Sequence, residues 1–356
     1  MRILHLDSGR HWRGGQRQVF LLATAQRERG FEPLVVAAPH SPLAGRLKAA
    51  GIASAAVAMR ADFDFIAMRR VRRLISRWRP DVVHAHDARS HAIALGALIG
   101  LRIPLVVTRR VPFVPRGRFK YGARVAHFIG ISRAVCDAMQ QGGVAAARCS
   151  VVYSGVPAPQ VGTPRDWRRE ALWPPDTLLC GVVGAMTAEK GVARLHDIAA
   201  HLAPATRERL RLVLLGGTAV GADSFGGIAG YRAGFVDAIH DAMAGLDLLW
   251  HPSGAEGLGT AVIDAMALGV PPVAFATGGL AELVEPGVSG LLAPPGDVPA
   301  FAGEVARLVA DAGLRHRLAE GGRARAAHFS VGRMVDGTAA VYASVLARHT
   351  AAGRAP

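Results

Sequence analysis

Two acidic residues and a group of glycines lie close together in residues 251–282, the segment HPSGAEGLGTAVIDAMALGVPPVAFATGGLAE. The segment predicts a strand end, a glycine loop, a short helix, a second strand and a second glycine turn. Gly257 and Gly259 let the backbone approach a ligand, and the first N–H groups of the helix form a site for an anion. Glu256 and Asp264 are eight residues apart, a little over two helical turns, so both carboxylates can reach one bound molecule. We therefore expect this loop to bind the phosphate and the sugar of an activated donor.

Alternating strands and helices flank this segment and divide the chain into two halves. The first half predicts strands near residues 1–7, 32–38, 53–58, 81–86, 104–108, 126–132 and 151–155, with helices between them. The second half predicts strands near residues 177–184, 211–217 and 246–252, a helix from Phe235, and a mostly helical tail after Asp297. Residues 156–175 contain five prolines and no clear period, so they predict a linker. This pattern predicts an α/β protein with two doubly wound, Rossmann-like domains, residues 1–157 and 158–334, facing a central cleft that is the default ligand site.

Positive charge is concentrated in the first half of the chain. Residues 1–155 carry 25 Lys and Arg against 8 Asp and Glu, a net charge of +17, whereas the remainder carries 17 against 19, a net charge of −2. Codon composition can raise the number of arginines, but it does not place the excess in one half. A basic half indicates an anionic partner, which could be a phosphorylated acceptor, an acidic membrane surface or nucleic acid. No nucleic-acid-binding motif supports the last of these, so we expect no nucleic-acid partner.

Signals for export and membrane insertion are missing from the pattern. The longest apolar run, residues 92–101, is too short to cross a bilayer, and the N-terminal MRILHLD lacks a signal-peptide pattern. Cys136, Cys149 and Cys180 have no metal-site spacing and indicate no disulfide framework. The sequence therefore predicts a cytoplasmic protein that is at most peripheral on the inner face of the cytoplasmic membrane.

Several motifs occur together and in a familiar order along the chain. They are the glycine pair at 14–15, DVVHAH at 81–86, EKG at 189–191, and EGLGTAVIDAMALGVPPVA from residue 256, followed by GG. As a set they resemble the retaining glycosyltransferases of family 4, which have the GT-B fold. The resemblance implies a nucleotide-sugar donor held mainly by the C-terminal domain, an acceptor held by the N-terminal domain, and no required metal. It implies no cofactor beyond the nucleotide-sugar co-substrate, and a terminal helix, about residues 335–352, that crosses back to the first domain.

The resemblance assigns roles to the residues of the opening segment. Glu256 would contact hydroxyl groups of the donor sugar, and Asp264 would contact the ribose. The family has a glutamate at the second position, so the aspartate shortens this arm by one methylene group. Asp264 could instead cap local backbone or pair with an arginine. The diphosphate would meet backbone N–H groups of Gly257, Leu258, Gly259 and Thr260.

The EKG motif adds a cation to the expected donor site. By the resemblance, Glu189 and Lys190 belong to the donor site, and Lys190 grips the donor phosphates. The family pairs this lysine with an arginine, but Ala185 stands at that position. Because a leaving diphosphate accumulates negative charge, either another arginine (Arg13 or Arg232) replaces the missing cation or the activity is weak.

The first domain supplies the expected acceptor-binding residues. Gly15 lies in a loop that approaches both the donor phosphates and the acceptor in the family, and Arg13 and Gln16 flank it. Many family members have a histidine near the position of Arg110, which follows Arg109 at the end of a strand. Arginine cannot be a general base at neutral pH, but it can hold a phosphate or an acidic group of the acceptor. We thus expect Arg110 to act in the reaction together with Glu256 and Lys190.

His84 and His86 alternate on one predicted strand and so share a face. They could begin a metal site, but no third ligand is in register, and we expect no metal. His86, at the carboxyl end of the strand, is expected to line the acceptor site beside Arg109 and Arg110. His84 is expected to be a packed core histidine.

Two basic segments and one short connection complete the pattern. The helix over residues 65–79 carries six arginines and could lie on an anionic bilayer, or it could be an ordinary packed helix with a solvated basic face. The segment RGRFKYGAR, residues 116–124, is a second candidate for a membrane or acceptor patch. After Gly217 too few residues remain for the helix that the family has there, so the second domain is expected to be trimmed near the base of the nucleotide.

The sequence therefore predicts a retaining, metal-independent glycosyltransferase that moves a sugar from a nucleotide donor to an anionic acceptor. The acceptor would be a glycolipid or a cell-surface polysaccharide precursor, such as one of lipopolysaccharide synthesis. One alternative is a catalytically weakened GT-B protein that binds nucleotide sugar or glycan as a scaffold or regulator. Another is a nucleotide-sugar epimerase, which is disfavoured because few acid or base groups can be assigned to the cleft.

Overall fold

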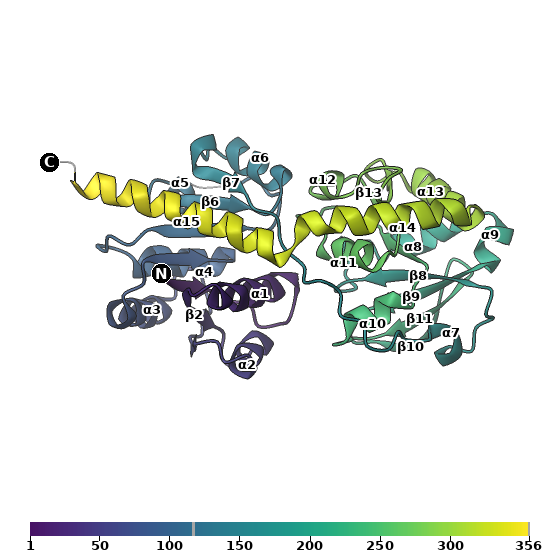
Figure 1. The fold of residues 1–356 in the computed structure, drawn as a ribbon, viewed down its shortest axis with the longest axis horizontal. Helices are drawn as coiled ribbons and strands as arrows, with labels where there is room; N and C mark the ends of the chain where they lie inside the picture. Colours follow the sequence, from purple (N-terminus) through teal and green to yellow (C-terminus); the bar gives the residue numbers. More distant parts are fainter. Residues whose placement is uncertain (116–117, 355–356) are drawn as a thin grey trace. The chain divides into compact units, whose positions relative to one another are not determined.

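The computed structural model describes residues 1–115 and 118–354, and the chain divides into two compact units (Figure 1). Unit 1 comprises Met1–Gly155 and Val331–Pro356, and unit 2 comprises Val156–Ser330. Each unit is built on one seven-stranded sheet with helices on both faces. The predicted α/β class with two Rossmann-like sheets is confirmed.

The sheet of unit 1 is parallel throughout, in the order β3-β2-β1-β4-β5-β6-β7. Its strands are β1 (Arg2–Leu6), β2 (Glu32–Ala37), β3 (Ser54–Ala56), β4 (Val82–Ala85), β5 (Leu105–Arg109), β6 (His127–Gly130) and β7 (Cys149–Val151). Its helices are α1 (Gly14–Glu28), α2 (Pro42–Ala49), α3 (Phe65–Trp78), α4 (Ala88–Ala97), α5 (Arg118–Tyr121), α6 (Arg133–Gln141) and the terminal α15 (Val331–Arg354). The chain order reverses between β1 and β4, so the loops after these strands form the crevice where open α/β sheets bind ligands.

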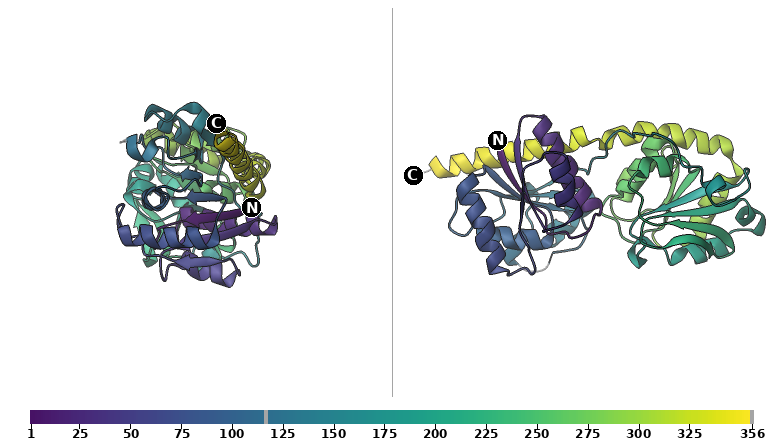
Figure 2. Two further views of the ribbon diagram at one scale, coloured as in Figure 1. Left: turned by 90° about the vertical axis from the view of Figure 1, so that its left-hand side faces the viewer. Right: turned by 90° about the horizontal axis from the view of Figure 1, so that it is seen from below.

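The two faces of the unit 1 sheet have separate apolar cores. Leu4 and Leu6 of β1 pack in the core that α3 and α4 cover, whereas Ile3 packs in the core that contains Tyr342 of α15. Successive side chains of a strand point to opposite faces, so His5 lies on the face covered by α1 and α15. These two helices lie side by side (Figures 1 and 2), and the prediction that the terminal helix completes the first domain is confirmed.

The sheet of unit 2 has the order β10-β11-β9-β8-β12-β13-β14. Its strands are β8 (Leu178–Val183), β9 (Leu210–Leu215), β10 (Val220–Phe225), β11 (Ile228–Ala233), β12 (Leu248–His251), β13 (Pro272–Phe275) and β14 (Leu291–Ala293). Its helices are α7 (Trp167–Glu170), α8 (Arg194–Ala200), α9 (Pro204–Glu208), α10 (Ile239–Ala244), α11 (Thr260–Leu268), α12 (Leu280–Leu283), α13 (Val298–Ala310) and α14 (Ala312–Ala326). Here the chain order reverses between β8 and β12, and the loops after these strands carry the EKG motif and Glu256.

A β-hairpin follows Gly217, in the segment that was expected to lack the helix of the family. Strands β10 and β11 pair antiparallel, and β11 continues parallel beside β9. Gly226 and Gly227, which join them, have φ angles of 58° and 87°, and a two-residue turn with both angles positive matches the twist of the paired strands. The expected shortening after Gly217 is confirmed, and its structural form is an edge hairpin.

Two other predicted boundaries are wrong. The last strand of unit 1 ends at Val151 and does not extend to residue 155. The helix expected from Phe235 begins at Ile239, and the ring of Phe235 is largely exposed.

The prediction of a linker over residues 156–175 is also wrong. Helix α7 lies within this segment, and the side chain of Trp167 is fully buried. Its indole Nε1 donates a hydrogen bond of 2.8 Å to the carbonyl of Ala242. Proline content marks a stretch without regular structure, but here the stretch is packed onto unit 2 by one large aromatic anchor.

No helix in the described ranges, residues 1–115 and 118–354, is long and apolar enough to cross a membrane. In the candidate patch RGRFKYGAR, Arg116 and Gly117 lie outside the described residues.

Candidate functional site

The side chains of Lys190, His251 and Glu256 meet at the carboxyl end of the unit 2 sheet. The Nζ atom of Lys190 lies 2.6 Å from Oε2 of Glu256, and Nε2 of His251 lies 3.1 Å from the same oxygen. Lys190 comes from the turn after β8, and His251 is the last residue of β12. The side chain of Glu256 is only 13% exposed, so its charge is compensated by these two groups and little by water. The sequence missed His251, which lies five residues before Glu256 and inside the opening segment.

The environment of Glu256 decides its protonation state. Burial alone would raise the pKa of this carboxyl group, but the hydrogen bond from His251 and the charge of Lys190 outweigh burial and lower the pKa to about 2. Glu256 is therefore ionised at neutral pH and is a poor general acid.

The lowered pKa of Glu256 predicts that the free energy of unfolding depends on pH. This pKa falls from 4.5 to about 2 on folding, so the ionised group stabilises the fold by about 3 kcal/mol above pH 4.5. This contribution is lost as the pH falls from 4.5 towards 2. We expect the difference in unfolding free energy between wild type and Glu256→Gln, measured with urea, to shrink by about half between pH 7 and pH 3. Glu320→Gln, on the exposed surface of α14, serves as the control, and equal shrinkage in both variants would contradict the assignment.

Buried hydroxyl groups join the loops that carry Lys190 and Glu256. The Oγ atom of Ser253, which is fully buried, lies 3.1 Å from the carbonyl oxygens of both Glu189 and Ala255. Thr277 Oγ1 donates to the carbonyl of Ser253 at 3.2 Å. Three loops, which follow β8, β12 and β13, are thus fixed to one another, and this rigid arrangement holds the ion pair in place.

Two glycines permit the close approach of these loops. Gly278 has a φ angle of 52°, and a Cβ atom on it would lie 2.1 Å from the carbonyl oxygen of Glu256. Gly259 has a φ angle of 97° and immediately precedes α11, which begins at Thr260. Both conformations favour glycine, and the second one starts the helix directly after the Glu256 loop. The side chain of Leu258 is buried, so only the backbone of Gly257 and Leu258 is offered to a ligand.

Asp264 has a partner that the sequence did not reveal. Its Oδ1 atom lies 3.2 Å from Nε2 of His240, and the aspartate is 3% exposed. The backbone N–H of Gln160 donates to Nδ1 of His240 at 3.3 Å, so the proton of this imidazole is on Nε2 and is donated to Asp264. His240 lies 24 residues before Asp264, on a different helix, and no local pattern could have joined them.

Ala185 stands where the family has an arginine, and it leaves this position exposed to solvent. Ala185 is exposed at the end of β8, as is Glu189 of the EKG motif. Arg232 is not available as the second cation beside Lys190, because its Nε donates to the carboxylate of Asp223 on the neighbouring strand. Its guanidinium also lies 5.3 Å from the ring of Phe225. Arg13 belongs to unit 1, where it is exposed at the start of α1.

In unit 1, four of the predicted residues come together at the carboxyl ends of β1, β4 and β5. A Cβ atom on Gly15 would lie 3.6 Å from Cδ of Arg110, and Nη2 of Arg110 lies 3.5 Å from Nδ1 of His86. Gln16 donates from Nε2 to both oxygens of Asp7, at 3.0 and 3.1 Å. Burial lowers the pKa of Arg110 to about 10, against the opposing charge of Asp7 nearby, so the guanidinium remains charged.

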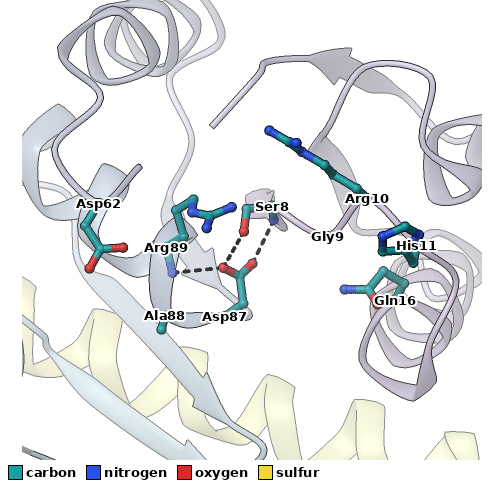
Figure 3. A pocket seen from close by; sticks show the side chains of 9 residues that line it. All are labelled: Ser8, Gly9, Arg10, His11, Gln16, Asp62, Asp87, Ala88 and Arg89. Atoms are coloured by element: carbon teal, nitrogen blue, oxygen red, sulfur yellow. Dashed lines mark hydrogen bonds between the residues drawn. The ribbon is translucent and has the colours of Figure 1, made fainter. Parts of the chain in front are cut away.

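A pocket of about 480 Å³ opens beside these residues (Figure 3). It is lined by the loop after β1, the first turn of α1, the loop before α3 and the start of α4: Ser8, Gly9, Arg10, His11, Gln16, Asp62, Asp87, Ala88 and Arg89. In Figure 3 the side chains of Ser8 and Asp87 point toward one another between those of Arg89 and Arg10, and the Oγ of Ser8 donates to Asp87 at 2.6 Å. Asp87 also caps α4 by accepting from the backbone of Arg89 and Ser90. The sequence missed most of this lining, although the loop SGRHWRGG carries two of its basic residues.

Arg109 is separated from the other predicted acceptor residues. Its guanidinium lies 5.7 Å from the ring of Tyr121 on α5. Adjacent residues at the end of a strand point to opposite faces, which explains why Arg109 and Arg110 diverge. The structure therefore groups Gly15, Gln16 and His86 with Arg110 but not with Arg109.

The expectation that no third ligand is in register with His84 and His86 is wrong, because His5 of the adjacent strand β1 lies beside them. Nitrogen atoms of the three rings lie within 4.8 Å of one another. However, Nε2 of His86 and Nδ1 of His5 lie 2.9 Å apart and face each other in a hydrogen bond, with the two rings close to coplanar at 25°. Nitrogens that bind each other in this way do not both present a lone pair to one ion. Hydrogen bonds occupy both nitrogens of His84, which bind Tyr342 and Thr108, as expected for a core histidine.

Comparisons with known proteins agree with this geometry. Residues 12–158 match the family model described as Glycosyltransferase Family 4, and residues 164–325 match the model described as Glycosyl transferases group 1. The chain belongs to glycosyltransferase family 4. Among curated relatives of this family 4 protein, the D-inositol 3-phosphate glycosyltransferase of Stackebrandtia nassauensis is 33% identical over 220 residues, which are 55% of this chain and 49% of the relative. The alpha-D-kanosaminyltransferase of Streptomyces kanamyceticus is 31% identical over 175 residues, 46% of this chain and 45% of the relative. The chain thus spans about half the length of the curated relatives that it matches.

Solved structures share the fold of this family 4 protein. Anabaena Alr3699/HepE in complex with UDP-glucose has a TM-score of 0.83 and 23% identity, and the match covers 97% of this chain and all of that one. The lipopolysaccharide outer core galactosyltransferase WaaB, in its apo form, has a TM-score of 0.71 and 18% identity over 97% of this chain and all of that one. At these identities the likeness shows the GT-B fold.

Proposed function

We propose that this family 4 protein transfers a sugar from a nucleotide-sugar donor to an anionic acceptor, with retention of configuration. The observation that carries the proposal is the meeting of Lys190, His251 and Glu256 beside the glycine loop that begins α11. A cation, a buried ionised carboxylate and the backbone N–H groups at the start of a helix are the parts that a diphosphate sugar needs. The complexes of HepE with UDP and UDP-glucose support this donor class.

Each group of the cluster has a separate task in the proposed reaction. Lys190 leaves its ion pair with Glu256 and neutralises the charge that grows on the leaving diphosphate. Glu256 then accepts hydrogen bonds from the donor sugar, since its low pKa keeps it ionised and His251 holds it in place. The buried Asp264, oriented by His240, is proposed to contact the ribose either directly or through a water molecule.

The proposed chemistry exchanges one bond at the anomeric carbon for another. The bond to the diphosphate oxygen breaks while the bond to the acceptor oxygen forms on the same face, and the acceptor proton passes to the leaving phosphate. This route needs no protein general base, which suits a site where Arg110 replaces the family's histidine. We propose that positive side chains, and no metal ion, stabilise the leaving group.

The proposed acceptor binds at the pocket of unit 1 and carries an anionic group. Arg10, His11 and Arg89 line this pocket, and the charge of Asp87, which also lines it, acts on Arg110. The exposed face of α3 suggests that the acceptor is a lipid-linked glycan at the inner face of the cytoplasmic membrane. Phe65 and Ile66 are each at least two-thirds exposed at the start of this helix, and its exposed arginines are Arg69, Arg70, Arg73 and Arg77. Apolar tips beside a row of cations are typical of peripheral binding to anionic lipid.

Incubation of the purified protein with a panel of nucleotide sugars and membrane lipids of the host tests the proposal. We expect one glycolipid or glycan product by mass spectrometry, with the anomeric configuration of the donor by NMR, and unchanged turnover in EDTA. Sedimentation with anionic vesicles should weaken as salt rises. Inversion of configuration, loss of activity in EDTA, or vesicle binding that is insensitive to salt would each overturn the corresponding part of the proposal.

One observation favours a second candidate function, a weakened GT-B protein that binds nucleotide sugar as a scaffold or regulator. Ala185 leaves Lys190 without its usual arginine, and Arg232 is engaged by Asp223. Binding of UDP-sugars without turnover of any donor in the same panel would favour this candidate. Turnover that disappears in Lys190→Ala would exclude it.

A further inference from the structure

We propose that two buried neutral histidines, His86 and His5, form a one-way hydrogen-bond chain that positions the guanidinium of Arg110. The inference rests on the proposed function only in the statement that Arg110 binds the anionic acceptor. His86 and His5 are therefore positioning residues that act through Arg110.

The chain runs from the crevice of unit 1 into the core beneath α1 and α15. Nη2 of Arg110 lies 3.5 Å from Nδ1 of His86, and Nε2 of His86 lies 2.9 Å from Nδ1 of His5. Nε2 of His5 then lies 2.8 Å from Oε1 of Gln26 on α1. These residues come from four different parts of the fold, and His5 and His86 are 81 residues apart in the sequence. The pairing of strands β1 and β4 brings them together.

The donor groups of this chain can point in one direction only. A guanidinium has donors and no acceptor, so Nδ1 of His86 must accept and its proton must be on Nε2. That proton is donated to Nδ1 of His5, so the proton of His5 is also on Nε2 and is donated to Gln26. All three bonds are satisfied by this assignment, whereas a proton on Nδ1 of His86 would face the N–H of Arg110.

Burial keeps both imidazoles neutral, which the chain requires. His5 and His86 are almost fully buried. Burial lowers the pKa of His5 to about 4, and it lowers the pKa of His86 well below the usual value, with the nearby His84 and Arg110 acting in the same direction. A protonated ring would lose its acceptor nitrogen and break the chain.

This chain holds the guanidinium of Arg110 in place and leaves its positive charge available to an anionic ligand. Arg110 forms no ion pair with a carboxylate in the described part of the chain. Asp7 and Asp87 lie close enough for their charges to act on Arg110, but neither is within ion-pair distance, and their oxygens bind other groups. Asp7 accepts from Gln16 and the backbone of Gly9, and Asp87 accepts from Ser8 and caps α4. A carboxylate partner would orient Arg110 equally well but would cancel the charge that an anionic ligand needs. A neutral imidazole acceptor orients it without that loss.

Nitrogen-15 NMR of the histidine rings in the full chain tests the geometry without any substrate. We expect both His5 and His86 to carry their proton on Nε2 at pH 7. In Arg110→Met, which removes the donor at the head of the chain, we expect His86 to populate both tautomers. A proton on Nδ1 of His86 in the wild type, or no change in Arg110→Met, would overturn the proposal, whether or not the protein proves to be a transferase.

A matched pair of variants at His5 tests the consequence for the ligand. Asn places an acceptor oxygen where Nδ1 of His5 lies, whereas Leu offers none. We expect His5→Leu to raise the KM for the acceptor about tenfold with little change in kcat, and His5→Asn to restore most of the affinity. In the Arg110→Met background the two variants should not differ. Equal KM values for folded His5→Leu and wild type would contradict the role, and a shift in kcat alone would point to a different one.

Discussion

Glu256→Gln is expected to lower kcat/KM for the donor by about 10²–10³-fold, the range found when one preorganised hydrogen-bonding group that stabilises a transition state is removed. The substitution keeps the size of the side chain but removes the charge that Lys190 and His251 bind at 2.6 and 3.1 Å. An amide cannot act as the ionised acceptor for sugar hydroxyl groups. Steady-state kinetics with the donor found in the panel assay measures the effect.

The design includes a control and a double variant. Glu320→Gln makes the same chemical change at an exposed position of unit 2 and should leave kcat/KM unchanged. Because Glu256 and Lys190 are in direct contact, Lys190→Met in the Glu256→Gln background should cost much less than it does alone. Fully additive losses, or a Glu256→Gln variant within threefold of wild type, would show that the pair is not part of the donor site.

Trp167→Ala is expected to destabilise unit 2 by about 3–5 kcal/mol, the range for truncation of a fully buried tryptophan. The indole is completely buried, it donates to the carbonyl of Ala242, and the guanidinium of Arg165 lies 3.9 Å from its ring. Truncation leaves a cavity under α7 and an unpaired carbonyl group. Urea unfolding of the full chain, followed by circular dichroism, measures the loss.

Leu172→Ala provides the comparison within the same segment. This leucine is 91% exposed, so truncation should change the unfolding free energy by less than about 0.5 kcal/mol. If both variants were equally harmless, residues 156–175 would behave as the linker that their five prolines suggest. A large loss for Trp167→Ala alone establishes that the segment is part of the core.

Much of the candidate donor site was predictable because its signals are local in the chain. Glu256, the flanking glycines and the EKG motif occupy short stretches, in which the residue types themselves indicate turns and helix starts. The structure adds the reason for their spacing: Gly278 must be glycine because the Glu256 loop passes too close for a Cβ atom. The shortened connection after Gly217 was likewise predictable by counting residues.

The partners of these residues were not predictable. His240 beside Asp264 and Ser253 beneath Glu189 are contacts between loops and helices that follow different strands. The identity of such partners depends on the order of strands in the sheet, which a single sequence does not contain. For the same reason the sequence predicts a linker in the proline-rich stretch where Trp167 is in fact buried.

The sequence by itself determined the alternation of strands and helices, the two sheets, the glycine loop with Glu256 and Lys190, and the excess of positive charge in residues 1–155. These features depend on local periodicity and composition. Only the tertiary structure decided that His5 joins His86, that Arg110 turns toward them and that Arg109 turns away. The physical reason is that β1 lies beside β4 at the reversal of strand order, so side chains from distant parts of the chain share one buried face and must satisfy one another's hydrogen bonds.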